Sequence, residues 1–399
     1  MRVLIAGGGI GGMTAALCCL HFGHDVVLFE QAAELGEVGA GLQIPPNAMK
    51  VFNALGIEDL IAKNAFRPAA IEARMGKSGR HIFTIPLAQQ AIDMWGAPYL
   101  HIHRADYISA LETALRAKSK NVLQLGANVL GYQQDNQGVT VRLKDGRAVK
   151  GDILIGADGI NSVIRKQMLG PDTAVFTGNM AWRAVVPTDA LGDLAPNPTA
   201  CVWMGRGKHG VTYRLRQGKL ANFVGVVERD DWTQENWTER GRQDDALRDF
   251  EGWHPTITNL IKAVKPEALY RWALFDRAPL AQWTGGRATL LGDAAHPMLP
   301  FLAQGAAMAV EDSWVLAREI SNTERPVDES LEAYQSLRLS RTRKTQLKSR
   351  ANMKTFHHRT LAGQLATYGP MWLAGNLAPS LVHKRMDWIY SFDVTKVFT

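Results

Sequence analysis

The sequence predicts an α/β protein that combines a Rossmann-like nucleotide-binding domain, an inserted and mostly antiparallel β domain, and a helical C-terminal region. Short apolar runs such as Val3–Ala6 and Ile153–Ile155 are typical of parallel strands that are buried on both faces. Alternating strands between 175 and 280 indicate an antiparallel sheet. From Ser330 onward the chain has helical periodicity and many basic residues.

The chain has 399 residues, of which 46% are hydrophobic and 21% charged, and a net charge of +7. This length fits roughly two to three domains of a folded protein. The basic residues are spread widely, so we expect a mild attraction for anions and no nucleic-acid partner. Cys18, Cys19 and Cys201 have neither disulfide nor metal-ligand spacing, and we expect no metal. The sequence has no signal peptide or membrane-spanning run, so we expect no membrane contact and a cytoplasmic protein.

The first residues form a βαβ unit of strand Val3–Ala6, helix Met13–Phe22 and strand Asp25–Phe29. The same patterns predict helices over 46–55, 104–118 and 305–320, a β-meander over 122–149, short strands and turns over 71–99, and strands over 152–157, 199–204, 210–215, 220–227 and 288–291. We assign residues 1–70, 100–174 and 281–330 to the nucleotide-binding domain, 71–99 and 175–280 to a substrate-binding domain, and 331–399 to the helical region.

A glycine pattern, GxGxxG, lies between the first strand and the first helix at Gly7, Gly9 and Gly12, and Glu30 ends the second strand. In this context the pattern is the dinucleotide-binding fingerprint. Gly7 permits the tight turn, Gly9 lets the backbone approach a pyrophosphate, and Gly12 allows close helix packing, while Glu30 accepts hydrogen bonds from a ribose. The pattern alone does not choose between FAD and NAD.

Two further motifs follow predicted strands: Gly156-Ala157-Asp158-Gly159, and Gly292-Asp293 within Leu290–Pro297. Each places an aspartate at the carboxyl end of a strand, where α/β sheets bind ligands. With these motifs and His101-Ile102-His103-Arg104, the chain resembles the single-component FAD-dependent aromatic hydroxylases, relatives of salicylate and hydroxybenzoate hydroxylases. The resemblance covers nearly the whole chain, from Arg2 to at least Arg318.

The resemblance implies roles for several of these residues. Asp293 would contact the ribityl chain of the flavin, Asp158 would help to hold both FAD and the nicotinamide nucleotide, and Arg104 would lie near the pyrophosphate. We add Gln31 and Gln43 as predicted cofactor contacts, although Gln43 stands where hydroxynicotinate enzymes carry a histidine. A surface position for Arg104 and a helix-capping role for Asp293 remain alternatives.

The predicted helix over 305–320 begins directly after the Gly292-Asp293 motif. Its N-terminus, aimed at the pyrimidine edge of a flavin, would stabilise the negative charge that develops there on reduction. Gly305 and Ala306 are therefore predicted cofactor contacts. The alternative is an amphipathic core helix.

The chemistry implied by the family is hydroxylation of a small phenolic ring. NADH or NADPH reduces the FAD, O2 adds to form a C4a-hydroperoxide, and its distal oxygen is transferred to the ring. The protein excludes water, positions the ring and favours the phenolate. The single nucleotide fingerprint fits this family, in which the nicotinamide nucleotide visits without a domain of its own.

His209 and Tyr213 are the predicted catalytic residues, because their spacing places both on one face of a strand in the substrate sheet and they resemble the His and Tyr of hydroxybenzoate 6-hydroxylases. An exposed or capping histidine is the alternative. His296 is not chosen, since in the family the His-Pro pair shapes a turn, which makes Pro297 a wall of the pocket. The remaining predicted substrate contacts are Arg183, Cys201, Phe223 and Phe301, with Trp182 and Trp203 as further candidates; core packing is the alternative for these aromatic residues, and a salt bridge for Arg183.

The basic run Arg338–Lys344 is interpreted as the solvated face of a helix, with a membrane or partner contact as an alternative. A homodimer is left open. Other hypotheses are a hydroxylase of hydroxynicotinate, urate or a quinolone, an epoxidase, another FAD-dependent oxidoreductase, and a non-catalytic binding protein. The sequence leaves undecided the aromatic substrate and the ring position, decarboxylation, NADH against NADPH, and oligomeric state.

Overall fold

The computed structural model describes residues 1–36, 41–229 and 239–397. A six-stranded sheet has the order β17-β18-β11-β1-β2-β7, and all its neighbouring strands are parallel except the β17–β18 pair. Its strands are β1 (Arg2–Ala6), β2 (Asp25–Phe29), β7 (Leu123–Gln124), β11 (Ile153–Gly156), β17 (Thr284–Gly285) and β18 (Ala288–Leu290). The short apolar runs therefore form the predicted parallel sheet.

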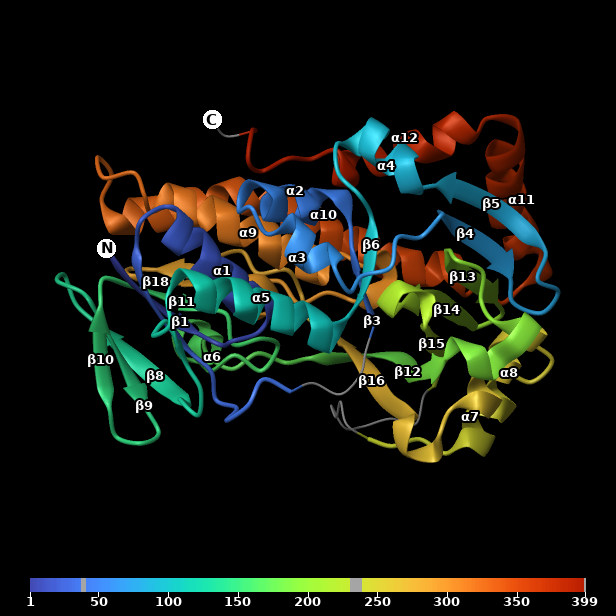
Figure 1. Cartoon of the computed structure of the whole chain (residues 1–399), viewed down its shortest axis with the longest axis horizontal. Helices are drawn as coiled ribbons and strands as arrows, with labels where there is room; N and C mark the ends of the chain where they lie inside the picture. Colours follow the sequence, from blue (N-terminus) through green and yellow to red (C-terminus); the bar gives the residue numbers. More distant parts are fainter. Residues whose placement is uncertain (37–40, 230–238, 398–399) are drawn as a thin grey trace.

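A seven-stranded sheet has the order β16-β12-β15-β14-β13-β4-β5, and only β13 and β4 pair in parallel. Its strands are β4 (Ala70–Met75), β5 (His81–Pro86), β12 (Val175–Pro187), β13 (Ala200–Gly205), β14 (Lys208–Leu215), β15 (Leu220–Glu228) and β16 (Tyr270–Asp276). Figure 1 shows the two sheets at opposite ends of the molecule. The inserted sheet is mostly antiparallel, as predicted.

Helices cover both sheets. They are α1 (Ile10–His21), α2 (Pro46–Ala54), α3 (Glu58–Ala62), α4 (Ala88–Trp95), α5 (Arg104–Lys118), α6 (Val163–Leu169), α7 (Gln243–Asp249), α8 (Pro255–Ala263), α9 (Gly305–Glu319), α10 (Val327–Phe356), α11 (Leu361–Leu377) and α12 (Pro379–Tyr390). The helical C-terminal region is confirmed: α10 runs from the main sheet toward the seven-stranded sheet, and α11 and α12 pack beside β5 at the far end of the molecule (Figure 1). No helix among the described residues is long and apolar enough to cross a membrane.

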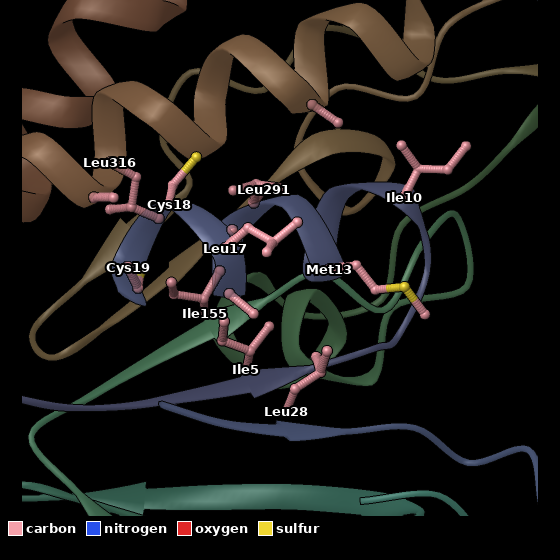
Figure 2. Close-up of a cluster of buried hydrophobic side chains, with 14 of the residues drawn as sticks. Ile5, Ile10, Met13, Leu17, Cys18, Cys19, Leu28, Ile155, Leu291 and Leu316 are labelled. Carbon is pink, nitrogen blue, oxygen red and sulfur yellow. The ribbon is translucent and has the colours of Figure 1, made fainter. Parts of the chain in front are cut away.

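Helix α1 lies between the six-stranded sheet and α9 (Figure 2). Ile5, Leu28 and Ile155 from three neighbouring strands and Leu316 from α9 are all fully buried around it. Cys18 and Cys19 belong to the same core and are free thiols, so they serve as small apolar residues. Packing on both faces fixes the position of α1, and with it the glycine turn that precedes the helix.

Two local predictions were wrong, and one pair of strands was missed. The meander is shorter than expected, because β7 joins β2 in the main sheet and only β8 (Val129–Gln134), β9 (Val139–Leu143) and β10 (Ala148–Gly151) form the separate antiparallel sheet. Helix α4 occupies part of the segment expected to hold only strands and turns. A short pair, β3 (Gly41–Ile44) and β6 (Leu100–His103), was not predicted. The domain boundaries stay a prediction.

Candidate functional site

Three loops meet at one edge of the main sheet. Strands β18, β11 and β1 are neighbours, and the residues that follow their carboxyl ends line a single cavity of about 1070 Å³. Gly292 and Asp293 come from the first loop, Ala157 and Gly159 from the second, and Gly9 from the third. The three motifs that the sequence places far apart therefore lie together.

The glycine turn fits a bound dinucleotide, because its glycines serve different purposes. Gly7 has φ +105°, and a Cβ on Gly12 would lie 1.8 Å from the carbonyl oxygen of Gly7, so the protein's own packing requires both glycines. Gly9 has extended backbone angles that any residue adopts, and a Cβ there would meet nothing within 4 Å. The space beside Gly9 thus opens to the cavity, as the approach of a pyrophosphate requires.

Glu30 lies directly beside this turn, where its carboxylate accepts hydrogen bonds from the backbone N–H of Gly8 and of Ala32, both at 2.7 Å. These bonds fix the carboxylate at the end of β2, the position from which it would meet a ribose. Gln31 is exposed, and the described residues that line the cavity do not include it. Its predicted cofactor contact has no geometric support.

The carboxylate of Asp158 is used within the protein. It accepts hydrogen bonds from the hydroxyl of Ser162 at 2.5 Å and from the backbone N–H of Val163 at 2.7 Å, so it caps the start of α6. Its neighbours Ala157 and Gly159 line the cavity. The structure thus gives Asp158 a turn-shaping role, and its contact with a nucleotide stays a prediction.

Sequence reasoning missed Arg165, which connects two of the motifs. Its guanidinium donates to the carbonyl of Ala294 at 3.0 Å and to the carbonyl of Ile160 at 2.6 Å. The side chain is almost completely buried. Nothing in the local pattern distinguishes this arginine from others on a helix, because the bond to Ala294 depends on a loop that is distant in the sequence.

Asp293 and Arg104 both line the cavity. Asp293 is exposed to the cavity, and desolvation by the protein around it raises the pKa of its carboxyl, against the opposing effects of His296, Arg104 and Arg165. Burial lowers the pKa of the Arg104 guanidinium, and the charge of Asp293 opposes that change. The pair gives this part of the cavity the donors and acceptors that a ribityl chain and a pyrophosphate need.

Helix α9 begins at the cavity. Gly305 and Ala306 line it, and Gln304, also on the cavity wall, is the N-cap residue. The first turn carries no acidic residue, so the positive end of the helix dipole is not neutralised by its own side chains. A Cβ on Gly305 would make only ordinary contacts, the nearer at 3.7 Å to Met298. The packing of the protein therefore does not require glycine at this position. Negative charge in the cavity would be stabilised here.

The substrate end of the cavity is one face of the seven-stranded sheet. His209, Val211 and Tyr213 alternate along β14 and all line it, and Arg183 on β12 joins them. The guanidinium of Arg183 lies over the ring of Trp272, 4.6 Å from its centroid, and donates to the carbonyl of Gly41 at 3.3 Å. The predicted pair His209 and Tyr213 therefore shares a face that opens to the cavity.

Four predicted pocket residues lie on the opposite face, and this corrects the prediction. Cys201 and Phe223, together with Trp182 and Trp203, pack in a core that α7 and α8 cover. On the same strands their neighbours line the cavity: Ala181, Arg183, Ala200, Val202 and Val224. Because side chains alternate along a strand, an error of one residue in phase moves the whole set to the other face.

The turn after His296 was predicted only in part. Pro297 is buried and its carbonyl accepts a hydrogen bond from Gln346 at 2.8 Å, while the cavity lining resumes at Met298 and includes Phe301. Pro297 is thus not among the wall residues, which corrects that prediction. Gln43 lines the cavity, and its side-chain oxygen accepts from the hydroxyl of Tyr99 at 2.5 Å.

Burial determines the protonation states of His209, Tyr213 and Arg183, which we call the substrate wall. It lowers the pKa of His209 well below the ordinary value, with a smaller contribution from His357. It raises the pKa of Tyr213 to about 12 and lowers that of Arg183 to about 10. At neutral pH the wall therefore presents a neutral imidazole, a phenol hydroxyl and a cation.

A buried ionic network connects α9 to α10 and to His296. Asp312 lies 2.5 Å from His296 Nε2 and 2.7 Å from Arg338 Nε, and Glu311 binds Arg341 through two contacts of 2.7 Å. Arg338, Glu311 and Asp312 are fully buried. The interpretation of the basic run as a solvated face is therefore wrong for Arg338 and Arg341, whose partners lie on α9. His296 also has a structural role, as the sequence suggested.

The comparisons with known proteins agree with this geometry. Residues 1–349 match the family described as FAD binding domain. The chain belongs to this family. Over 395 residues it is 36% identical to the 3-hydroxybenzoate 6-hydroxylase of Polaromonas naphthalenivorans, covering 99% of this chain and 96% of the relative. Over 398 residues it is 34% identical to a 3-amino-4-hydroxybenzoate 2-monooxygenase of Streptomyces platensis, covering 99% and 97%.

A solved structure of Klebsiella pneumoniae HpxO, complexed with FAD and uric acid, is similar with a TM-score of 0.85 and 28% identity, covering 98% of this chain and 97% of that one. The chain is a single-component FAD-dependent aromatic hydroxylase. The roles of the individual motif residues in holding FAD stay predictions. The described residues contain no cluster of side chains suited to a metal ion.

Proposed function

We propose that this hydroxylase acts on a phenolic ring that carries a carboxylate, held against the wall of His209, Tyr213 and Arg183. Bound FAD, reduced by NADH or NADPH, supplies the activated oxygen from O2. The chain's own residues orient the ring, exclude water and accept the phenol proton. The single observation that carries the proposal is that this polar wall and the flavin motifs line the same cavity.

The positive charge of Arg183 favours an anionic substrate. The charged or titratable groups that act on its pKa are Tyr213 and Arg104, and neither is a carboxylate. The side chain is partly buried, and its Nε has no hydrogen-bond partner among the described residues. A substrate carboxylate would satisfy this cation, and Lys344, Lys348 and Arg385 on the same cavity add to the attraction for anions.

The neutral imidazole of His209 is a suitable acceptor for the phenol proton, and the hydroxyl of Tyr213 is a suitable donor to the resulting phenolate. Its pKa of about 12 keeps Tyr213 protonated throughout the neutral range. The apolar side chains of Val211, Val224 and Leu274 line the cavity together with these polar groups. An apolar wall excludes water from the reacting ring.

A larger ring system, such as a quinolone, is the second candidate substrate. The cavity continues beyond the polar wall to Ile71 and Phe83 of the sheet and to Met371 and Met386 of the C-terminal helices. These side chains are apolar, and methionine adapts to irregular shapes. A single benzoate ring would leave this part unfilled.

The test is a screen for aromatic compounds that accelerate NADH or NADPH oxidation by the FAD-loaded protein, with the product identified to exclude uncoupled peroxide release. The panel contains hydroxybenzoates, hydroxynicotinates, urate and larger phenols. Arg183→Gln should raise the KM of the best aromatic acid about tenfold or more. The KM of the corresponding amide, which lacks the negative charge, should rise less. Arg214→Gln is the control, because Arg214 lies on β14 and donates to the carbonyl of Pro196. Equal KM changes for acid and amide would contradict the role of Arg183.

A further inference from the structure

A chain of hydrogen bonds leads from the substrate wall to the protein surface. His209 Nδ1 lies 2.6 Å from His357 Nε2, and His357 Nδ1 lies 3.2 Å from a carboxylate oxygen of Glu228. The other carboxylate oxygen of Glu228 binds the guanidinium of Arg359. His209 is 1% exposed, His357 4% and the side chain of Glu228 24%, so exposure to solvent increases along the chain.

Three separate elements bring these groups together. His209 is on β14, Glu228 is the last residue of β15, and His357 is the C-cap residue of α10. The backbone carbonyl of His357 accepts a hydrogen bond from Gly207, which anchors the end of α10 to the β13–β14 turn. The rings of Phe301 and Phe356 lie 5.3 and 5.1 Å from that of His209 and shield it.

We propose that His357 and Glu228 form a proton exit for the hydroxylase: they position His209 and carry the phenol proton from it to solvent. This inference rests on the proposed function of the substrate wall.

One set of tautomers lets every bond in the chain form. His209 carries its hydrogen on Nδ1 and donates to His357, and His357 carries its hydrogen on Nδ1 and donates to Glu228. His209 Nε2 then accepts the proton from the phenol O–H, which becomes a phenolate. The Nδ1 proton of His209 passes to His357 Nε2, and the Nδ1 proton of His357 passes to the carboxylate. The proton leaves from Glu228, and both imidazoles end neutral.

The surroundings explain why an exit is needed. Burial lowers the pKa of both His209 and His357, so neither ring retains an extra proton at neutral pH. Among the described residues, the charged groups that act on this pair are Glu228, which opposes the shift of His357, and Arg359, which adds to it. A buried base that cannot hold the proton requires a partner that passes it on.

The experiment measures the hydroxylation step by stopped flow in FAD-loaded protein, with 3-hydroxybenzoate, salicylate and 6-hydroxynicotinate as probes, between pH 6.5 and 8.5. Glu228→Gln keeps an oxygen that accepts from His357 but does not take up a proton, and His357→Gln interrupts the chain one step earlier. His358→Gln is the matched control, because His358 contacts Thr367 and Tyr368 instead.

The wild type and His358→Gln should show a rate that changes little with pH. Both relay variants should be slower at pH 7 by about tenfold or more, and their rates should rise about tenfold per pH unit because hydroxide must remove the proton. FAD content and melting temperature show whether the fold is intact. Wild-type rates and pH profiles in a folded Glu228→Gln would overturn the relay alone. Failure of every compound in the wider screen to stimulate the wild type would overturn the proposed function itself.

Discussion

Replacing Gly9 by alanine separates cofactor binding from folding. Gly9 has φ −74° and ψ −174°, which alanine adopts without strain, and the added Cβ would meet no protein atom within 4 Å. The stability of the protein without FAD should therefore change by less than about 0.5 kcal/mol. The methyl group would occupy the space through which a pyrophosphate approaches the backbone, so FAD affinity should fall about ten- to a hundredfold, or about 1.4–2.8 kcal/mol.

The assay is a titration of the apoprotein with FAD, followed by the change in flavin fluorescence, together with a urea melt without FAD. Gly369→Ala is the control. Gly369 lies inside α11, also has open space around its would-be Cβ, and should show no change in FAD affinity. Unchanged FAD affinity in Gly9→Ala would refute the placement of the FAD pyrophosphate beside Gly9. A large loss of apoprotein stability would show that Gly9 is constrained by packing.

Three further predictions concern stability. Gly12→Ala should destabilise the apoprotein by about 3 kcal/mol in urea melts, because the Cβ would lie 1.8 Å from a backbone oxygen; a neutral result would mean that the turn adapts. Asp312→Asn should cost about 3–5 kcal/mol in the same melts, since it leaves His296 and Arg338 without the shared carboxylate; a loss below 1 kcal/mol would contradict the network. Burial lowers the pKa of His101 to about 3, so below pH 6.5 the unfolded state binds the proton first and stability falls as pH falls, by about 2 kcal/mol between pH 6.5 and 5; His101→Phe should lose this part of the pH slope, and an identical slope would contradict it.

The cofactor half of the site was predictable because local rules determine it. A strand, a glycine turn and a helix in sequence order specify where Gly7, Gly9 and Gly12 lie, and the carboxyl ends of parallel strands share one edge of the sheet. Asp293 and Gly305 follow from the same rule. Asp158 and Gln31 show where this rule ends. The sequence pattern predicts the position of their backbone but not the direction of their side chains.

The substrate half was harder because both faces of its sheet are buried. Cys201 and Val202 are both apolar neighbours on β13, so alternation gives no sign of which one faces the cavity. On β14 the polar residues His209 and Tyr213 indicated which face of the strand lines the cavity. The partners His357, Glu228, Arg338 and Asp312 depend on contacts between distant segments, and no spacing in the sequence reveals them.

FAD and an aromatic substrate are expected to share one cavity, between the strand ends of the main sheet and the inserted sheet. The most direct measurement is a crystal structure of the protein with FAD and the aromatic acid that best stimulates NADH or NADPH oxidation. We expect a flavin in contact with Gly9, Asp293 and the start of α9, and a ring in contact with His209 and Tyr213. A flavin bound elsewhere, or a ring bound on the Cys201 and Phe223 face, would contradict it.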